Sequence, residues 1–595
     1  MDDNQNSYYQ NKKSINQNYW KLSTKTELET HFELFFSQRF NFPSALVPIL
    51  IDNKVSKDNF ELFVDPKIKN FLPDPSIFID MDKTVKRIAN EIENKNPIGV
   101  FGDYDVDGAT SAALLKLFLQ YFGIEVHIHI PDRFLEGYGP NISALNSLVS
   151  KGSNLIITVD CGINSYEPLK ELNKTDIDCI IIDHHTPDDD LPPAFSIVNP
   201  KRKENGIEYH YLSAVGVTFI MIVGLTRELR QRGVFEKIKE PNLFRFLDLV
   251  ALGTVCDVVP LKGLNRCFVK AGLNIISQRK NLGINALCDI SDLNKIPDEE
   301  TLGYKLGPKI NAAGRIGSSD IGVSLLISKD ISKANELASK LYQLNEKRKK
   351  LTNNSTLEAI GMVESEKNKI GKLPDFLFLV GENWNEGIIG ILAGKIKEKY
   401  NRPCCVISLG QNHSKGSARS IANIPIGEYF LEALDKKLLL KGGGHDLAAG
   451  LTIENNKIQM FKDFLISKVE HAFQENELVS EISVTSELSI SALNSDLMDW
   501  IKKLGPWGQG NPIPKFLIKD VIIKKLVFFG KEKQHLLVKV SDNSGEIDCK
   551  IFNINETAFS SVLEKNKSLH LLGNLVSNEW NNKNKVEFNL IDIMT

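Results

Sequence analysis

The 595-residue sequence has few of the features that mark a membrane or secreted protein. It contains no apolar run of the length, about 18 residues or more, that a membrane-spanning helix needs. The polar, Asn- and Gln-rich start lacks the apolar core of a signal peptide, and we expect residues 1–26 to form a disordered tail. The eight cysteines are scattered and form no Cys-x-x-Cys pair, which argues against a zinc ribbon or a disulfide framework. These absences predict a cytoplasmic protein with no membrane partner.

The sequence also lacks a strong net charge. Its formal charge is −3, so a nucleic-acid partner would have to be attracted by local basic patches. A hydrophobic content of 42% and a charged content of 25% are those of an ordinary globular protein. The length predicts roughly three or four domains.

Strand and helix patterns alternate between residues 98 and 199, as in a multidomain α/β protein. Apolar runs such as IGVFG and NLIITVD are separated by helical lengths of sequence, which predicts a parallel, doubly wound sheet. A charged segment with leucines at helical spacing predicts a long connecting helix over 329–366, followed by a second α/β unit over 367–455. A helical linker over 456–480 then leads to residues 481–595, where successive short strands predict a β-barrel.

An acidic loop, GDYDVDGATS, follows the first predicted strand. Asp103, Asp105 and Asp107 alternate in it as they would in an EF-hand calcium loop. An EF-hand requires a glutamate at the twelfth loop position, where this chain has Leu114, and a helix before the loop, where this chain has a strand. The EF-hand is therefore excluded, and the context is a strand, an acidic turn and a helix.

Further acids and histidines lie near the ends of predicted elements of the same unit. Ligands of doubly wound sheets bind outside the carboxyl ends of the strands. The candidate catalytic residues there are Asp105, Asp107, Asp160, His184, His185 and Asp257. Oxygen and imidazole ligands without thiolate suit Mn²⁺ or Mg²⁺, and so many of them suggest two ions that share a carboxylate, as in displacement at phosphorus. An aspartate after a strand often only caps the next helix, but capping does not explain the whole set.

Four motifs in this order, GDYDVDGATS, TVDCG, IDHH and GTVCDVVPL, resemble those of the DHH phosphoesterases. PDRFLEGYG, LGPKINAAGRIG, KGSARS and GGGHDLAAG resemble segments of the RecJ single-strand-specific exonucleases within that superfamily. The resemblance, from about residue 27 onward, implies a DHH catalytic domain over 27–328, a DHH-associated domain over 367–455 and a DNA-binding OB-fold over 481–595. It also implies two divalent cations, Mn²⁺ or Mg²⁺, and 5′→3′ removal of nucleotides from single-stranded DNA in recombination and repair.

Family roles are transferred only to positions that match a motif. The resemblance implies that the metal ligands are Asp105, Asp107, Asp160, His184 and Asp257, with Asp160 bridging two ions. His185 would then contact metal or the scissile phosphate. Asp103, Asp183 and Asn311 are expected to support the site.

A second group of residues is expected to bind the DNA and its 5′-terminal phosphate: Arg133, Tyr138, Arg315, Ser417, Arg419 and His445. A guanidinium group matches phosphate geometry with two parallel hydrogen bonds, which lysine cannot reproduce. Tyr138 offers a flat surface for base stacking. We expect a monomer, and the resemblance implies a helicase and a single-strand binding protein as partners, whose docking surfaces no residue identifies.

Two other functions remain open at this point. A DHH phosphodiesterase of short oligonucleotides or cyclic dinucleotides would share the first two domains but would not need the barrel. A non-catalytic DNA-binding scaffold would not need the acids and histidines. One departure from the family is Asn385, in NWNEGIIGI, where relatives usually have histidine. The charge run EKRKK, residues 346–350, is interpreted as a solvated face of the connecting helix.

Overall fold

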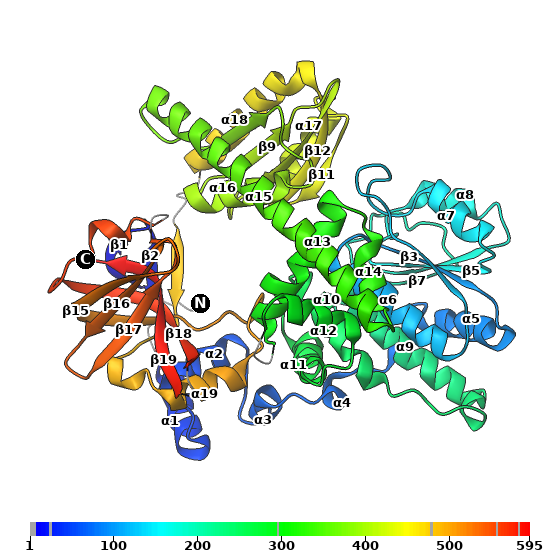
Figure 1. Ribbon diagram of the computed structural model, residues 1–595, viewed down its shortest axis with the longest axis horizontal. Helices are drawn as coiled ribbons and strands as arrows, with labels where there is room; N and C mark the ends of the chain where they lie inside the picture. Colours follow the sequence, from blue (N-terminus) through cyan, green and yellow to red (C-terminus); the bar gives the residue numbers. More distant parts are fainter. Residues whose placement is uncertain (1–6, 23–25, 294–296, 476–479, 555–556, 581–582) are drawn as a thin grey trace. The chain divides into compact units, whose positions relative to one another are not determined.

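A five-stranded parallel sheet lies among helices (Figure 1). Asp103 and Asp160 directly follow two of its strands. The computed structural model describes residues 7–22, 26–293, 297–475, 480–554, 557–580 and 583–595. The strand order is β4-β3-β5-β6-β7, with the bounds β3 Ile98–Gly102, β4 Val126–His129, β5 Leu155–Val159, β6 Asp178–Ile182 and β7 Ser196–Val198. This confirms the predicted doubly wound sheet. Its order reverses between β3 and β5, which is the switch point where such sheets bind ligands.

Helices cover both faces of this sheet (Figure 1). They are α5 Met81–Asn94, α6 Val106–Tyr121 and α9 Ala214–Gln231 on one face, and α7 Ile142–Ser150 and α8 Tyr166–Leu172 on the other. Strands β3 and β5 are buried along their whole length, as expected for parallel strands covered on both faces. The side chain of Asp105 caps α6 by accepting a hydrogen bond from the Gly108 N–H at 3.0 Å, so the helix starts inside the acidic loop.

A helical layer continues this unit. It comprises α10 Leu247–Cys256, α12 Leu282–Ile290, α13 Gly307–Ile316 and α14 Asp320–Leu326. Helix α11, Gly263–Ser277, belongs to this unit only from Ala271 onward. The connecting helix is α15, Ile331–Ile370, which packs against α12, α13 and α14 and also against α16. It begins at Asp330, whose side chain accepts from the Lys333 N–H, and ends at Gly371 with φ 80°. Among the described residues, no helix is both long and apolar enough to cross a membrane.

The second sheet has the order β11-β12-β10-β9-β8, with β8 Leu377–Gly381, β9 Cys404–Ser408, β10 His413–Arg419, β11 Lys441–His445 and β12 Ala448–Glu454. Helix α16, Ile389–Tyr400, packs on one face, and α17, Ile426–Asp435, on the other. Helix α18, Ile458–Glu475, also packs on the α17 face through Phe461, Leu465 and Val469. The predicted linker over 456–480 is therefore, where described, a part of this layer; residues 476–479 lie outside the described chain.

A closed barrel of β15, β16, β17, β19 and β18 belongs to a separate compact unit. The bounds are β15 Phe516–Phe529, β16 His535–Ser541, β17 Glu546–Ile551, β18 Ser568–Trp580 and β19 Lys583–Met594. Strand β15 pairs with both β16 and β18, which closes the barrel and confirms the predicted OB-fold class. Short β14, Ser486–Glu487, extends β15 on its edge.

The barrel unit also contains residues from outside the predicted barrel domain, 481–595. Helices α1 Glu27–Phe40, α2 Val47–Asp52 and α3 Phe60–Val64 belong to it, as do Pro260–Lys270, although all of them fall within the range predicted for the catalytic domain. Helix α19, Ser495–Leu504, also belongs to this unit, as predicted. Phe36, Phe42 and Phe60 are buried in the same core as Phe516 and Phe588 of the barrel. Residues 27–71 thus pack with the barrel rather than with the catalytic sheet, because their apolar side chains are buried there.

The predicted disordered tail is wrong for residues 7–22. These residues form β1, Ser7–Lys13, and β2, Tyr19–Leu22, and β2 pairs in parallel with β13, Glu481–Val484. Trp20 is fully buried, and its Nε1–H donates to Asp592 Oδ2 at 3.0 Å. This one side chain holds the segment in place, although the composition of the segment is mostly polar. Residues 1–6 and 23–25 of the predicted tail lie outside the described chain.

Candidate metal centre and anion site

The carboxyl edge of the parallel sheet brings the predicted acids and histidines together. Their donor atoms form three groups in which all atoms lie within 4.8 Å of one another. The groups are Asp103, Asp105 and Asp160; Asp107, His184 and Asp257; and Asp160, His184 and His185. All six predicted catalytic residues are included, together with Asp103, which was expected only in a supporting role.

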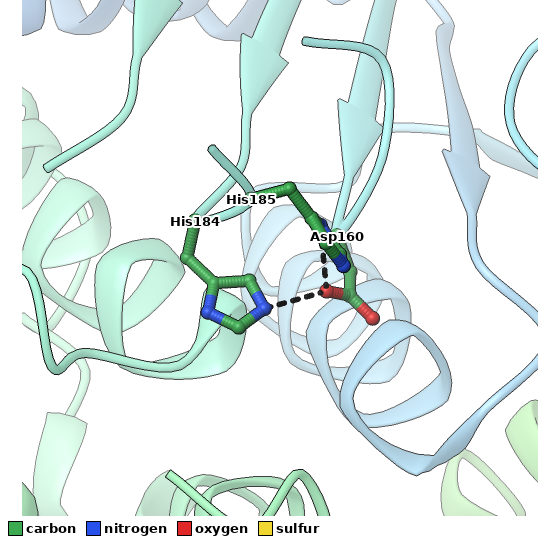
Figure 2. A group of neighbouring side chains, drawn as sticks. All are labelled: Asp160, His184 and His185. Carbon is green, nitrogen blue, oxygen red and sulfur yellow. Dashed lines mark ion pairs between the residues drawn. The ribbon is translucent and has the colours of Figure 1, made fainter. Parts of the chain in front are cut away.

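Asp160 lies at the centre of the set. One of its oxygens, Oδ1, is 3.4 Å from His184 Nε2 and 3.9 Å from His185 Nδ1, and Figure 2 shows both imidazoles facing this carboxylate. Directly after β5, Asp160 has a left-handed backbone with φ 61°, a conformation that aspartate tolerates better than most residues. Because the Asp160 carboxylate belongs to two of the three groups, it would be shared if two cations were bound.

His184 presents a lone pair to this centre. Its Nδ1 lies 3.0 Å from the Leu212 carbonyl, which can only accept, so Nδ1 carries the proton. The unprotonated Nε2 then faces Asp160 Oδ1 and Asp257 Oδ2, both at 3.4 Å. Burial, assisted by the charge of His185, lowers the pKa of His184 to about 3, which keeps the imidazole neutral. A neutral imidazole oriented by a backbone carbonyl is the form that binds metal.

The carboxylates are buried next to one another without enough hydrogen-bond donors. Burial and the charge of Asp105 raise the pKa of Asp107 to about 7, and burial with like charges raises the pKa of Asp160 and Asp257 well above the usual range. Four buried atoms of this centre have no hydrogen-bond partner among the described residues: Asp103 Oδ1, Asp160 Oδ1, Asp257 Oδ2 and His184 Nε2. Buried acceptors that face one another are stabilised by a cation, so the donor set fits divalent metal.

Two aspartates hold the surrounding backbone. Asp107 accepts from the Ala214 and Val215 N–H groups at 2.6 and 2.9 Å, at the start of α9. Asp183 accepts from the His185 Nδ1–H at 2.8 Å and from backbone N–H groups. Burial would raise the pKa of Asp183, but its hydrogen bond with His185 and the charge of that imidazole hold it at about 2. These contacts fit the supporting role expected for Asp183.

Arginines form a second cluster beside the acidic loop. The Arg133 guanidinium lies 5.3 Å from the ring centroid of Tyr104. Arg315 Nη1 donates to the Gly387 carbonyl at 3.2 Å, and Arg419 Nη1 donates to Ser417 Oγ at 3.1 Å. Burial, together with the charges of neighbouring arginines, lowers the pKa of Arg315 to about 10.

The other predicted DNA-binding residues are more dispersed. The Tyr138 hydroxyl contacts His185 Nδ1 at 3.2 Å, which ties its half-exposed ring to the metal centre. His445 is an exposed residue at the end of β11 and has no described contact with the arginines. Asn311 lies on α13, one helical turn before Arg315. Asn385 accepts from the Gly387 N–H at 2.9 Å and so shapes the turn that Arg315 contacts.

One charged residue of the cluster was missed in the sequence. Arg348 belongs to the run EKRKK, which was interpreted as a solvated face, yet it is half-buried while Glu346, Lys347, Lys349 and Lys350 are exposed. Its charge acts on Arg315. Its position in the sequence could have indicated this burial. Arg348 follows Leu341 by seven residues, so the two side chains lie on the same face of the helix.

The parallel sheet and the acidic site define a DHH-type phosphoesterase. Residues 97–254 match the DHH family, N-terminal domain, 374–471 the DHHA1 domain and 484–592 the RecJ OB domain. The chain belongs to the RecJ family. It is 34% identical over 516 residues to the single-stranded-DNA-specific exonuclease RecJ of Haemophilus influenzae, covering 85% of this chain and 89% of that protein.

The chain is also similar in sequence and in structure to other RecJ proteins. The protein of the same name from Bacillus subtilis is 32% identical over 539 residues, which cover 90% of this chain and 66% of that one. A crystal structure of RecJ in complex with Mn²⁺ from Thermus thermophilus matches with a TM-score of 0.80 at 25% identity, covering 97% of this chain and 79% of that one. RecJ from the same organism has also been solved with Mg²⁺.

Proposed function

We propose that this protein is a two-metal-dependent 5′→3′ exonuclease that hydrolyses single-stranded DNA to 5′-mononucleotides in recombination and repair. The observation that carries the proposal is a set of buried, unpartnered acid and histidine donors at the switch point of the sheet, with an arginine cluster beside it. A cation-binding edge and an anion-binding cluster side by side suit a phosphodiester next to a terminal phosphate.

In this proposal Asp105, Asp107, Asp160, His184 and Asp257 hold two divalent cations, Mn²⁺ or Mg²⁺, with Asp103 available as a further oxygen donor. When bound, such cations activate water and neutralise charge that develops on the phosphoryl oxygens. His185, whose Nδ1–H is held by Asp183, would contact a metal ion or the scissile phosphate. Arg133, Arg315, Arg419 and Ser417 bind the terminal phosphate, and Tyr138 stacks on the terminal base, with His445 and Asn311 in supporting contacts.

The barrel distinguishes this proposal from a phosphodiesterase of short oligonucleotides. An enzyme for dinucleotides has no use for the closed barrel formed by β15 to β19, whereas OB barrels bind single strands. We further propose that the protein acts as a cytoplasmic monomer, with a helicase and a single-strand binding protein supplying and covering its substrate.

The proposal is tested by digesting 5′-labelled and 3′-labelled single strands with Mn²⁺ or Mg²⁺. We expect early release of labelled mononucleotide from the 5′-labelled strand and progressive shortening of the 3′-labelled one. A matching duplex should be resistant. Early release from the 3′ label, or equal rates on dinucleotides and long strands, would reject the proposal.

Removing the central carboxylate provides the matched variant. We expect Asp160→Asn to lower the cleavage rate by roughly 10³-fold or more, because the shared donor of the two ion sites is lost. Asp189→Asn, at an exposed acid paired with Lys203, is the control and should retain the wild-type rate. DNA binding measured by fluorescence anisotropy separates the catalytic defect from misfolding, since the Asp160 variant should still bind.

A further inference from the structure

The segment between β4 and α7, residues 130–141, is closed by a single carboxylate. Glu136 Oε2 accepts hydrogen bonds from His129 Nε2–H at 2.8 Å and from Asn141 Nδ2–H at 3.0 Å. Because an ionised carboxylate can only accept, His129 Nε2 carries a proton here. Glu136 Oε1 accepts from the Asp132 N–H at 2.8 Å. Three donors from different parts of the chain therefore converge on one side chain.

These bonds fasten the segment to both of its neighbouring elements. His129 is the last residue of β4, and its ring stacks on Phe101 of β3, with ring centroids 5.4 Å apart and planes inclined by 25°. Phe101 is fully buried in the sheet. Asn141 is the N-cap of α7, where its Oδ1 accepts from the Ala144 N–H at 2.9 Å. Glu136 is thus tied to the sheet on one side and to the start of α7 on the other.

The first half of the segment is a tight turn around Arg133. Asp132 Oδ1 accepts from the Phe134 and Leu135 N–H groups at 2.8 and 3.1 Å. The Glu136 N–H donates to the Asp132 carbonyl at 2.8 Å. Backbone and side-chain bonds between Asp132 and Glu136 therefore close the turn in both directions.

The second half of the segment carries Tyr138 between two glycines. Gly137 and Gly139 have φ 85° and 77°, a left-handed backbone that glycine adopts without strain and can leave as readily. The hydrogen bond between Glu136 and Asn141 joins the two ends of this flexible stretch. It therefore restricts the backbone on both sides of Tyr138.

The contacts of Tyr138 itself are too weak to fix its ring. Its hydroxyl lies 3.2 Å from His185 Nδ1 and donates to the Asp160 carbonyl at 3.4 Å, which is long for a hydrogen bond. Both contacts are at one end of a half-exposed ring. The orientation of the ring also depends on the backbone of residue 138, which the bond between Glu136 and Asn141 restricts.

Glu136 is held as an anion. Burial would raise its pKa, but the hydrogen bonds from Asp132, Asn141 and His129 lower the pKa below its ordinary value. Hydrogen bonds to an ionised acceptor are roughly twice as strong as those between neutral groups. A glutamine at this position would have one acceptor oxygen in place of two, and its amide group would face at least one of the three donors. At least one donor would then lose its acceptor.

We propose that Glu136 is a positioning residue for the DNA end: it clamps residues 130–141 between β4 and α7 and so holds Tyr138, together with the turn around Arg133, where the terminal nucleotide binds. The metal ligands lie on other segments, so loss of the clamp should weaken binding of the DNA end and leave the chemical step nearly unchanged. The role of Tyr138 and Arg133 in binding DNA rests on the proposed function, whereas the clamp rests on the hydrogen bonds alone.

The first test needs no nucleic acid. Limited trypsin digestion of the native, full-length protein reports how often the turn opens, through the rate of cleavage after Arg133 measured by mass spectrometry. We expect Glu136→Gln to be cut there at least tenfold faster than wild type, with unchanged rates at other sites. Glu125→Gln, at a 71% exposed acid just before β4, is the control and should be cut like wild type. Equal rates after Arg133, or acceleration at every site alike, would overturn the proposal.

Variants of the donor show whether the hydrogen bond itself matters. His129→Gln keeps an N–H group for Glu136 and should be cut after Arg133 at close to the wild-type rate. His129→Leu keeps apolar contact with Phe101 but has no donor, and it should be cut as fast as Glu136→Gln. Equal behaviour of the two His129 variants would contradict a clamp that depends on this bond.

A double-mutant cycle tests whether Glu136 acts through Tyr138. On a 5′-phosphorylated single strand with saturating Mn²⁺, Glu136→Gln should raise KM about tenfold and change kcat less than threefold. Tyr138→Ala should raise KM by a similar factor, and adding Glu136→Gln to it should raise KM less than threefold further, because coupled residues are not additive. Fully multiplied effects would overturn the positioning role. A wild type that resists trypsin after Arg133 but cleaves no DNA would reject the proposed function and leave the clamp standing.

Discussion

Burial changes the chemistry of individual aspartates here in two different settings. At the metal centre, burial and the neighbouring acids raise the pKa of Asp160 and Asp257. A bound cation would lower both pKa values again, because its charge stabilises the ionised carboxylates. Asp248, on α10, is 4% exposed, and burial raises its pKa from 3.8 to about 7 with no acidic neighbour involved. The first setting concerns ligand binding and the second concerns stability alone.

Asp248 should make the protein less stable as the pH rises. Its folded pKa lies above its unfolded value, so the folded state holds a proton that the unfolded chain releases, and stability falls between pH 3.8 and about 7. The shift corresponds to a loss of about 4 kcal/mol by pH 8, as an order of magnitude. Asp248→Asn should therefore be more stable than wild type at pH 8 and nearly equal to it at pH 4, as measured by urea unfolding. Asp189→Asn should show no such pH-dependent gain, and a gain of equal size at both pH values would contradict the assignment.

At the scale of elements, the metal centre depends on a close approach of α10 to α6. A Cβ on Gly253 would lie 2.3 Å from Thr110 Oγ1, 2.8 Å from Val215 Cγ1 and 3.0 Å from Asp107 Oδ1. The absence of a side chain at this position lets α10 bring Asp257 to the same edge as Asp107. The helix spacing and the ligand geometry are therefore set by the same residue.

Gly253→Ala should damage both stability and metal binding. Overpacking against α6 typically costs about 1–3 kcal/mol, and displacement of Asp107 should weaken Mn²⁺ binding by tenfold or more. Gly361→Ala is the matched control, because Gly361 is exposed in the middle of α15 with no atom within 4 Å of its added Cβ. Gly361→Ala should raise the free energy of unfolding by about 0.5–1 kcal/mol, because alanine has a higher helix propensity than glycine. Calorimetric Mn²⁺ titration and thermal melts would detect both effects, and unaltered Mn²⁺ affinity in Gly253→Ala would refute the link.

Elements whose signals are local were predictable from the sequence. The strand before Asp103, the helix capped by Asp105 and the buried helix before Asp257 all follow from nearby apolar patterns, and strand ends of a parallel sheet necessarily meet at one edge. Contacts between distant segments were not predictable. The pairing of β2 with β13 and the hydrogen bond from Trp20 to Asp592 join residues more than 450 positions apart. The polar composition of the N-terminal segment does not indicate either contact. Arg348 was missed because a charge run conceals which of its members faces inward.

For the whole molecule, the division of the chain into two units has a thermodynamic consequence. One unit contains the parallel sheet, α15 and the second sheet, and the other contains the barrel with the segments before residue 71 and around residue 265. Each has its own buried core. Separate cores allow separate unfolding, so a single two-state transition is not expected.

Mn²⁺ and a core substitution should therefore act on different thermal transitions. Mn²⁺ at about 100 times its Kd should stabilise the unit with the metal centre by about 2.7 kcal/mol and leave the barrel unit unchanged. Trp20→Ala should lower only the barrel transition, with a cost of about 3–5 kcal/mol because a fully buried indole and its bond to Asp592 are removed. Differential scanning calorimetry with and without Mn²⁺ resolves the two, and Asp160→Asn should abolish the Mn²⁺ shift. If Mn²⁺ moved both transitions equally, or if Trp20→Ala removed the Mn²⁺ effect, the two units could not be energetically independent, and the metal centre would depend on the barrel for its stability.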